Sequence, residues 1–283
     1  MHNTPAKPRT TGEWAGYDLG HRTVSYDERD AVLYALAVGA KATELDLVFE
    51  ERLRVLPTFA LTLAQWVPDA LGALGAFDPE TALHGAQELT VHRPLPPRGE
   101  IEMSASVAAV WDKGRAAVFE VRVDSAYSTA TWSLFAPGRG GFGGQRGPAA
   151  PPAPQTAGAA TARVRTFAEQ AALYRLSGDR HPIHIDPEAA ARIGQPRPIL
   201  HGLCTLAATV LESARAADAH PADLCELSGR FAAPVFPGDV LDLRTWPLEG
   251  ALGYQVDKAG QAVVSGGRMR FRAGGGAGRT PSA

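Results

Sequence analysis

Cysteine is scarce in this sequence, with only Cys204 and Cys225 among 283 residues. Two cysteines cannot build the disulfide framework that staples small secreted folds. We therefore expect a fold held together by its hydrophobic core, in a reducing compartment that we take to be the cytoplasm.

An excess of charge of either sign is also missing, because the formal net charge is −2 at pH 7. This balance gives no reason to expect nucleic acid or an anionic membrane as a partner. Residues 1–13 have no apolar stretch, so we expect neither a signal peptide nor a membrane anchor there, but a polar and mobile segment. Hydrophobic residues make up 45% of the chain, enough for a core, and the length suits one large domain or two smaller ones.

The first half predicts helices and antiparallel strands. A capping-box pattern from Ser25 to Glu28 precedes a short apolar helix that ends at Gly39. Alternating polarity over 44–50 predicts a half-buried strand, and the apolar run 56–66 predicts a buried helix. Further strands are expected at 87–92, 100–111, 116–124 and 127–135.

The same order of features returns in the second half. A second capping-box pattern, Thr166 to Glu169, precedes another short helix, and His201-Gly202 opens an apolar helix over 203–211. Three landmark pairs share one spacing of 140 residues: Tyr34 and Tyr174, Pro94 and Pro234, Pro97 and Pro237. A constant spacing indicates an internal duplication. Each copy predicts an α+β layer in which a curved antiparallel sheet wraps around a long helix. The free edges of two such sheets can pair into one continuous sheet.

Composition sets the expected boundaries. We predict a first repeat over 1–137, a Gly-, Pro- and Ala-rich linker over 138–162, a second repeat over 163–272 and a flexible tail over 273–283. The glycine run 140–144 suggests a phosphate-binding loop, but neither G-x-G-x-x-G nor G-K-[ST] is present, which favours the linker.

Candidate catalytic residues cluster in the second repeat. Asp179 and His184 lie five positions apart, in a segment that Gly178 and Pro182 keep from being helical. Slightly later, the amide of Gly202 lies at a helix N-terminus, where negative charge is favoured. An acid/base pair and an anion-stabilising amide are the parts needed to add water next to a thioester.

The segment Tyr174–Thr205 also resembles a known family. Its pattern Y-x-L-S-G-D-x-x-P-x-H-x-D-P, followed by P-I-L-H-G-L-C-T, is similar to the signature of MaoC-like, type 2 enoyl-CoA hydratases. The resemblance is dense over these residues and looser over most of the chain. It implies a double hot-dog fold, a homodimer, and (R)-specific hydration of enoyl-CoA without a cofactor or a metal.

In the mechanism that the resemblance implies, Asp179 and His184 hold one water molecule. They deliver hydroxyl to C3 and a proton to C2 of a trans-2-enoyl thioester, while the Gly202 N–H stabilises the charged thioester oxygen. Which of the two side chains is the base stays open, because such a pair titrates as a unit. The first repeat has Gly39-Ala-Lys41 and Pro57-Thr58 at the equivalent positions, so we expect it to accommodate the acyl chain instead.

One position departs from the family pattern. His181 stands where the family usually has asparagine, and a histidine can charge near neutral pH, which bears on substrate positioning and pH optimum. The change creates His181-x-x-His184-x-Asp186, which suggests a metal site. Pro182 keeps the two histidines off one helical face, and no further ligand is evident, so we expect no metal. Asp186 is instead expected to cap the helix 188–193.

We expect His181, His201 and Arg230 to contact the substrate. Arg230, like Arg192 and Arg197, could pair with CoA phosphates or be a solvated surface residue. The neighbour of His201, Cys204, suggests a Cys/His nucleophile, but its place in an apolar helix favours a buried structural residue.

Two other functions remain open at this stage. One is a dehydratase acting on an intermediate bound to an acyl-carrier protein in polyketide or lipid biosynthesis. The other is a non-catalytic acyl-thioester binding protein, which the unusual His181 makes plausible.

Overall fold

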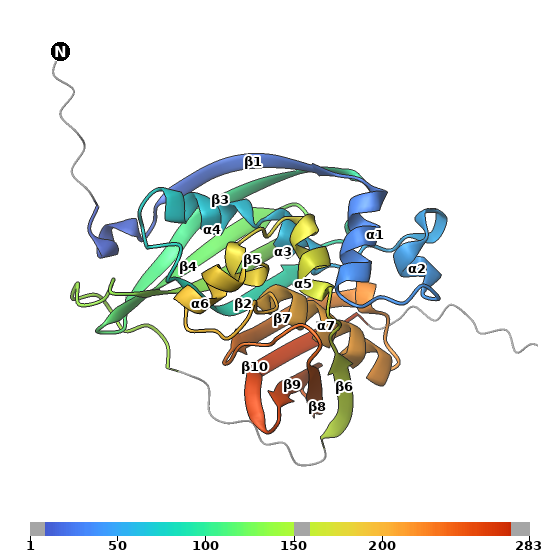
Figure 1. Ribbon diagram of the computed structural model, residues 1–283. Helices are drawn as coiled ribbons and strands as arrows, with labels where there is room; N and C mark the ends of the chain where they lie inside the picture. Colours follow the sequence, from blue (N-terminus) through green and yellow to red (C-terminus); the bar gives the residue numbers. More distant parts are fainter. Residues whose placement is uncertain (1–8, 150–158, 273–283) are drawn as a thin grey trace, which may run out of the picture.

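A computed structural model describes residues 9–149 and 159–272 of the chain (Figure 1). Its strands form one ten-stranded antiparallel sheet in the order β1-β3-β4-β5-β2-β7-β10-β9-β8-β6. The first repeat supplies β1 (Asp18–Tyr26), β2 (Leu83–Val91), β3 (Gly99–Asp112), β4 (Ala116–Ser125) and β5 (Ser128–Pro137). The second supplies β6 (Ala160–Arg165), β7 (Leu224–Phe231), β8 (Val240–Leu248), β9 (Ala251–Lys258) and β10 (Gln261–Phe271). The two halves have the same strand order, which confirms the duplicated α+β pattern.

The repeats join edge to edge. β2 pairs with β7 from Ala86↔Arg230 to Thr90↔Glu226, so the two predicted sheets are one continuous sheet. Leu89 and Leu227 face each other at this seam, and both are at most 2% exposed. One hydrophobic core runs through both repeats.

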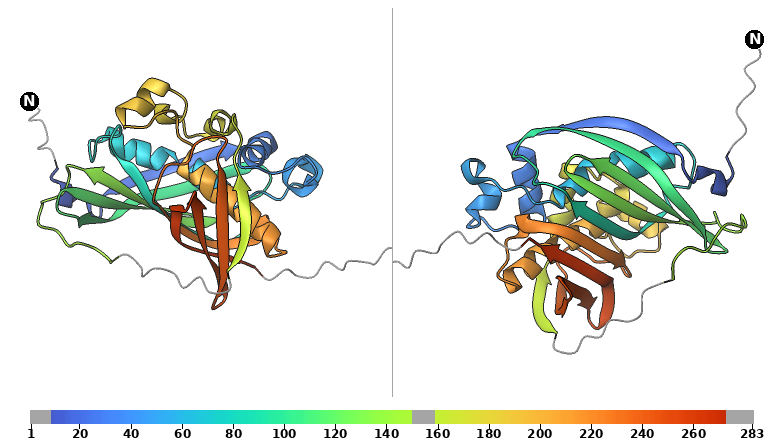
Figure 2. Two further views of the ribbon diagram at one scale, coloured as in Figure 1. Left: turned by 60° about the horizontal axis from the view of Figure 1, so that its bottom comes forward. Right: turned by 180° about the vertical axis from the view of Figure 1, so that it is seen from behind.

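The second repeat carries the long central helix. α7 (Gly202–Ala216) is buried along most of its length and packs against β6, β8 and β10 (Figure 2). Preceding it are α5 (Gln170–Tyr174), α6 (Pro187–Arg192) and the 3-10 turns η3 (Arg175–Ser177) and η4 (Pro182–His184); η5 (Pro221–Asp223) follows. The predicted helix after His201-Gly202 is confirmed.

The described residues of the first repeat, 9–137, contain no helix of this length. It has α1 (Glu28–Ala37), α2 (Leu45–Val48), α3 (Phe59–Leu63), α4 (Trp66–Ala73) and the 3-10 turns η1 (Thr11–Trp14) and η2 (Glu50–Arg52). The single helix predicted over 56–66 is therefore wrong. Pro68, early in α4, has no N–H to donate to the carbonyl of Ala64, so the backbone ladder breaks between α3 and α4.

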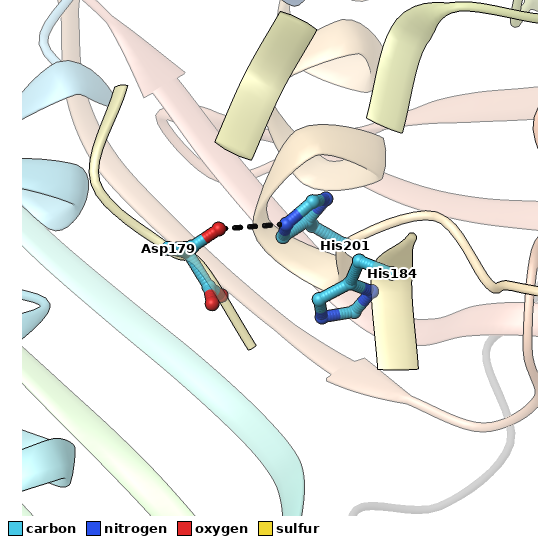
Figure 3. A group of neighbouring side chains, drawn as sticks. All are labelled: Asp179, His184 and His201. Carbon is cyan, nitrogen blue, oxygen red and sulfur yellow. Dashed lines mark hydrogen bonds between the residues drawn. The ribbon is translucent and has the colours of Figure 1, made fainter. Parts of the chain in front are cut away.

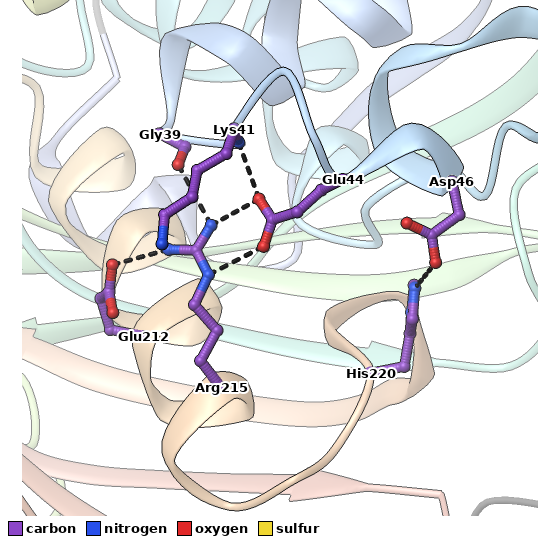
Figure 4. Close-up of polar contacts among 7 residues, drawn as sticks. All are labelled: Gly39, Lys41, Glu44, Asp46, Glu212, Arg215 and His220. Atoms are coloured by element: carbon purple, nitrogen blue, oxygen red, sulfur yellow. Dashed lines mark hydrogen bonds and ion pairs between the residues drawn. The ribbon is translucent and has the colours of Figure 1, made fainter. Parts of the chain in front are cut away.

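The strand predicted over 44–50 is also wrong, because this segment forms α2 and η2. Its polar side chains contact the second repeat (Figure 4). Glu44 accepts from Arg215 at 2.6 and 2.9 Å, and Asp46 accepts from His220 at 2.6 Å. Arg215 also bonds Glu212 at 2.6 Å and the carbonyl of Gly39 at 3.3 Å. These contacts, which we call the ionic strap, impose a conformation that local polarity does not indicate.

Both capping boxes differ from prediction. Asp27, not Ser25, caps α1: its carboxylate accepts from Asp30 N at 3.0 Å, and Asp30 accepts from Asp27 N at 3.1 Å. The hydroxyl of Thr166 instead donates to the carbonyl of Asp239 at 2.8 Å, so it does not cap α5.

The expected polar N-terminal segment is partly folded, because η1 buries Trp14 to 4% exposure. Residues 1–8, linker residues 150–158 and the predicted tail 273–283 lie outside the described part. The predicted linker overlaps the start of β6 at Ala160.

The glycine-rich stretch after β5 folds back onto the β3–β4 turn. The carboxylate of Asp112 accepts from the N–H groups of Gly114, Gly141 and Gly143 at 2.8 to 2.9 Å. A Cβ on Gly140 would lie 2.4 Å from the carbonyl oxygen of Gly114, so only glycine fits there. Because Asp112 already occupies these N–H groups, the stretch is not a phosphate loop.

Candidate active site

Asp179 lies in the turn between η3 and η4. Gly178 precedes it with φ 147°, and a Cβ at Gly178 would come within 3.3 Å of Thr62 in the first repeat. Glycine therefore lets the chain turn close against α3. Asp179 Oδ1 accepts from the His181 N–H at 3.1 Å, which steadies the carboxylate, and the side chain is half-buried.

His184 ends η4 and is 8% exposed. Its Nδ1 lies 2.9 Å from the carbonyl oxygen of Ile199. A carbonyl can only accept, so Nδ1 carries the proton and Nε2 keeps a lone pair. Burial lowers the pKa of His184, with Asp179 opposing the shift, so the ring is neutral near neutral pH.

His201 completes the cluster as the N-cap of α7, and it is 1% exposed. Its ring stacks on that of His184, with centroids 3.6 Å apart and planes at 25°. Its Nε2–H donates to the backbone carbonyl of Asp179 at 3.1 Å (Figure 3). Burial and, to a smaller extent, the neighbouring His184 lower the pKa of His201 to about 3.

Asp179, His184 and His201 each place one donor atom within 4.8 Å of the others. Two imidazoles and a carboxylate are common metal ligands. Here the two rings stack with their planes at 25°, and His201 Nε2 is already engaged by the backbone carbonyl of Asp179.

The metal motif read from the sequence does not assemble. Asp186 caps α6 by accepting from Glu188 N at 2.9 Å, as predicted. His181 accepts from Ile183 N at 3.4 Å, lies 3.3 Å from the carbonyl oxygen of Pro79, and its ring centroid is 6.2 Å from that of His184. Position 181 thus links the catalytic turn to the first repeat.

Gly202 opens α7, so no carbonyl within the helix accepts from its N–H. A Cβ at this position would lie 3.0 Å from Phe231 Cε1. The Phe231 ring in turn meets the ring of His84, with centroids 4.8 Å apart. Burial lowers the pKa of His84 to about 4, and its ring nitrogen lies 3.0 Å from the carbonyl oxygen of Ala86.

A cavity of about 520 Å³ opens onto these groups. Asp179, His184 and Gly202 line it, and so does Arg230, which is exposed at the end of β7. We expected both His181 and His201 to contact the substrate, but neither side chain lines this cavity. The rest of the wall is largely apolar and includes Leu83, Phe135, Ile199, Leu203, Phe231, Val235 and Val264.

The first repeat contributes Ala82 to Gly85 and Phe135 to this wall. Sequence patterns did not indicate Phe135 or Phe231 as wall residues, because their strands β5 and β7 come from different repeats. Another candidate arginine, Arg197, donates to the carbonyl of Pro237 at 3.2 Å and does not line the cavity. Cys204 is fully buried, and burial raises its thiol pKa, which disfavours a nucleophile.

Comparison with known proteins identifies the family to which this chain belongs. Residues 24–136 match the MFE-2 hydratase 2 N-terminal domain, and residues 149–265, which hold Asp179, His184 and Gly202, match the MaoC like domain. The 3-hydroxyacyl-thioester dehydratase Y of Mycobacterium tuberculosis is 36% identical over 277 residues, covering 88% of this chain and 94% of that protein. The chain belongs to the MaoC-like dehydratase family.

Other MaoC-like proteins agree. The peroxisomal enoyl-CoA hydratase 2 of Arabidopsis thaliana is 37% identical over 267 residues, covering 83% of this chain and 85% of that protein. The crystal structure of a MaoC-like dehydratase from Phytophthora capsici matches with a TM-score of 0.77 and 26% identity, covering 93% of this chain and 97% of that one. A Mycobacterium tuberculosis protein described as having a double hotdog fold matches with a TM-score of 0.56 at 14% identity, over 90% of this chain and 95% of that one, which bears on fold alone. The double hot-dog fold and the MaoC-like resemblance are confirmed.

Proposed function

We propose that this chain catalyses the reversible addition of water to a trans-2-enoyl-CoA thioester, giving a (3R)-hydroxyacyl-CoA. The observation that carries the proposal is the meeting of Asp179, the free lone pair of His184 and the Gly202 N–H at one wall of an apolar cavity. Family membership supports the same chemistry, since relatives are named enoyl-CoA hydratase and 3-hydroxyacyl-thioester dehydratase.

The chemistry follows from what each group can do. A water between Asp179 and His184 makes two hydrogen bonds of about 2.5–3.0 Å, a span compatible with donor atoms within 4.8 Å. The pair removes one proton from this water as its oxygen bonds to C3, and the pair delivers one proton to C2, so that the elements of one water add across the C2=C3 double bond. Negative charge that develops on the thioester oxygen is stabilised by the Gly202 N–H and the N-terminus of α7.

The test is the loss of enoyl absorbance when enzyme is added to crotonyl-CoA and to a longer enoyl-CoA. Asp179→Asn and His184→Gln are each expected to lower kcat by about 10²–10⁴, because positioned acid/base groups contribute that much. His21→Phe, an exposed residue on β1, is the matched control and should keep wild-type kcat. Wild-type rates in both active-site variants would show that Asp179 and His184 do not carry the reaction, whereas no turnover by the wild-type protein would favour a non-catalytic thioester-binding protein.

The acyl chain is proposed to extend into the first repeat. A second hollow of about 510 Å³ lies on that side of the catalytic turn, lined by Gly178 and by first-repeat residues that include Thr62, Trp66 and Ala70. Gly178 lines this hollow and Asp179 lines the cavity, so the turn lies between them.

Filling the second hollow tests this route. Ala70→Trp should lower kcat/KM for a ten-carbon enoyl-CoA at least tenfold and leave crotonyl-CoA nearly unchanged, whereas the exposed Ala172→Trp should change neither. Equal effects on both chain lengths would place the tail elsewhere.

We propose that the acyl group is carried by CoA. Exposed Arg230 at the cavity rim favours CoA, whose phosphates it can pair with, over an acyl-carrier protein. Comparing kcat/KM for the two carriers decides between them, and Arg230→Gln should raise KM for CoA substrates.

We also propose a homodimer, which sedimentation tests. A cytoplasmic location is proposed as well and is tested by fractionation, since the Arabidopsis relative is named peroxisomal. In the described part of the chain, no helix is long and apolar enough to cross a membrane.

A further inference from the structure

His201 touches both members of the catalytic pair without lining the cavity. Its Nε2–H holds the backbone of Asp179 at 3.1 Å, and one face of its ring covers His184 at 3.6 Å. The His201 ring also contacts that of Tyr174, with centroids 4.7 Å apart and planes at 49°. The imidazole is therefore held by two ring contacts and one hydrogen bond.

Tyr174, which contacts the ring of His201, also contacts residues of the first repeat. Tyr174 Oη lies 3.3 Å from Thr62 Oγ1, and its ring centroid lies 5.9 Å from that of Tyr34. A buried aromatic column thus runs from Tyr34 through Tyr174 and His201 to His184. The partner repeat, which has no catalytic pair of its own, supports the pair of the other.

The protonation state of His201 suits a structural role and not proton transfer. Charging it would put a proton on Nδ1, and no described group accepts from that buried atom. The titratable and charged groups that face the ring are His184, Asp179, Arg175 and Tyr174; of these, His184 and Arg175 also disfavour a charge, and only Asp179 favours it. A neutral ring leaves His184 free to take up a proton without a second cation stacked against it.

We propose that His201 is a positioning residue, which holds Asp179 by its backbone and His184 by its ring face so that the two side chains keep the separation that one water needs. The role rests on the proposed hydration. It differs from the substrate contact that the sequence suggested for this residue, because the ring lies behind His184 and not on the cavity wall.

Kinetics separate these two roles. His201→Ala removes both contacts and should lower kcat about 100-fold with KM within threefold of wild type, since small misplacements of reacting groups cost that much. His201→Phe keeps the stack and loses the donor, so its kcat should lie between those of His201→Ala and wild type. With the covering ring gone, His184 is less buried, and the acid limb of kcat/KM in His201→Ala should move to higher pH. A KM raised tenfold with kcat unchanged, or no change in kcat and pH profile, would overturn the proposal.

A spectroscopic measurement covers the case of an enzyme with no detectable hydration, or of variants that do not fold. In ¹⁵N-labelled wild-type protein, His201 should remain the neutral Nε2–H tautomer from pH 9 to pH 5. If the protein gave this spectrum but showed no turnover, the proposed function would be wrong, while the contacts of His201 would still be supported. Titration of His201 near pH 6 would refute the positioning role whatever the activity.

Discussion

At the scale of single residues, Gly202 occupies a position where a side chain does not fit. An added Cβ would press on Phe231 at 3.0 Å, and Phe231 cannot retreat freely because His84 lies against it at 4.8 Å. Gly202→Ala should therefore displace the N-terminus of α7 and lower kcat about tenfold or more, part of the 10²–10³ that an oxyanion donor contributes. Adding Phe231→Leu should recover some of this loss. Crotonyl-CoA kinetics measure both, and a wild-type kcat in Gly202→Ala would contradict the role given to its N–H.

Protonation at individual histidines sets the expected pH dependence. His201 and His84 have folded-state pKa values of about 3 and about 4, lowered first by burial, whereas the unfolded chain binds protons near pH 6.5. Below pH 6.5 the unfolded state takes up protons that the folded state does not, so stability is present above this value and is lost as pH falls toward 4. Denaturant midpoints at pH 7.5 and 5 should show the decline. His84→Phe should make it smaller, and an unchanged difference between the two midpoints would count against a buried neutral His84.

How much of the site could be foreseen depends on where its residues stand in the chain. Asp179, His184 and Gly202 belong to one short segment, and proline, glycine and helix signals there were enough to predict that they meet. His84 and Phe231 come from β2 and β7, which become neighbours only when the two repeats pair. His201 was found, but the stacking that gives it a support role is a tertiary contact with no sequence signal.

At the scale of elements, the ionic strap decides the conformation of α2 and joins it to α7. Burial opposes ionisation of Glu44, but Arg215 and Lys41 together outweigh it and lower the pKa of the carboxyl. Glu44→Gln should destabilise the protein by about 1.5–3 kcal/mol, the usual contribution of hydrogen bonds to charged groups. The matched control is Asp124→Asn, whose pair with Arg122 has similar geometry but is 48% and 41% exposed, and which should cost less than about 1 kcal/mol. Urea unfolding at pH 7 measures both, and equal losses would remove the strap's special role.

The elements that sequence patterns missed have a common cause. β1 and β6 are the two edges of the sheet, and their residues are mostly exposed, so they lack the alternation that identified β3. The break between α3 and α4 was missed for a different reason. Apolar residues continue across it, and only Pro68 indicates that the helical hydrogen bonds are interrupted. Strong one-sided burial was predictable, whereas edges and interrupted helices were not.

At the scale of the whole molecule, the β2–β7 seam makes two repeats into one folding unit. Leu89 and Leu227 are both buried there, and the core is continuous through it. Leu89→Ala should cost about 2–5 kcal/mol, and it should destabilise both repeats equally although the residue belongs to the first. Hydrogen exchange measured separately on β4 and β9 under mild denaturant should show protection falling in parallel. If β4 alone lost protection, the repeats would be independent domains, and the second would have to hold its catalytic pair without the aromatic column from the first.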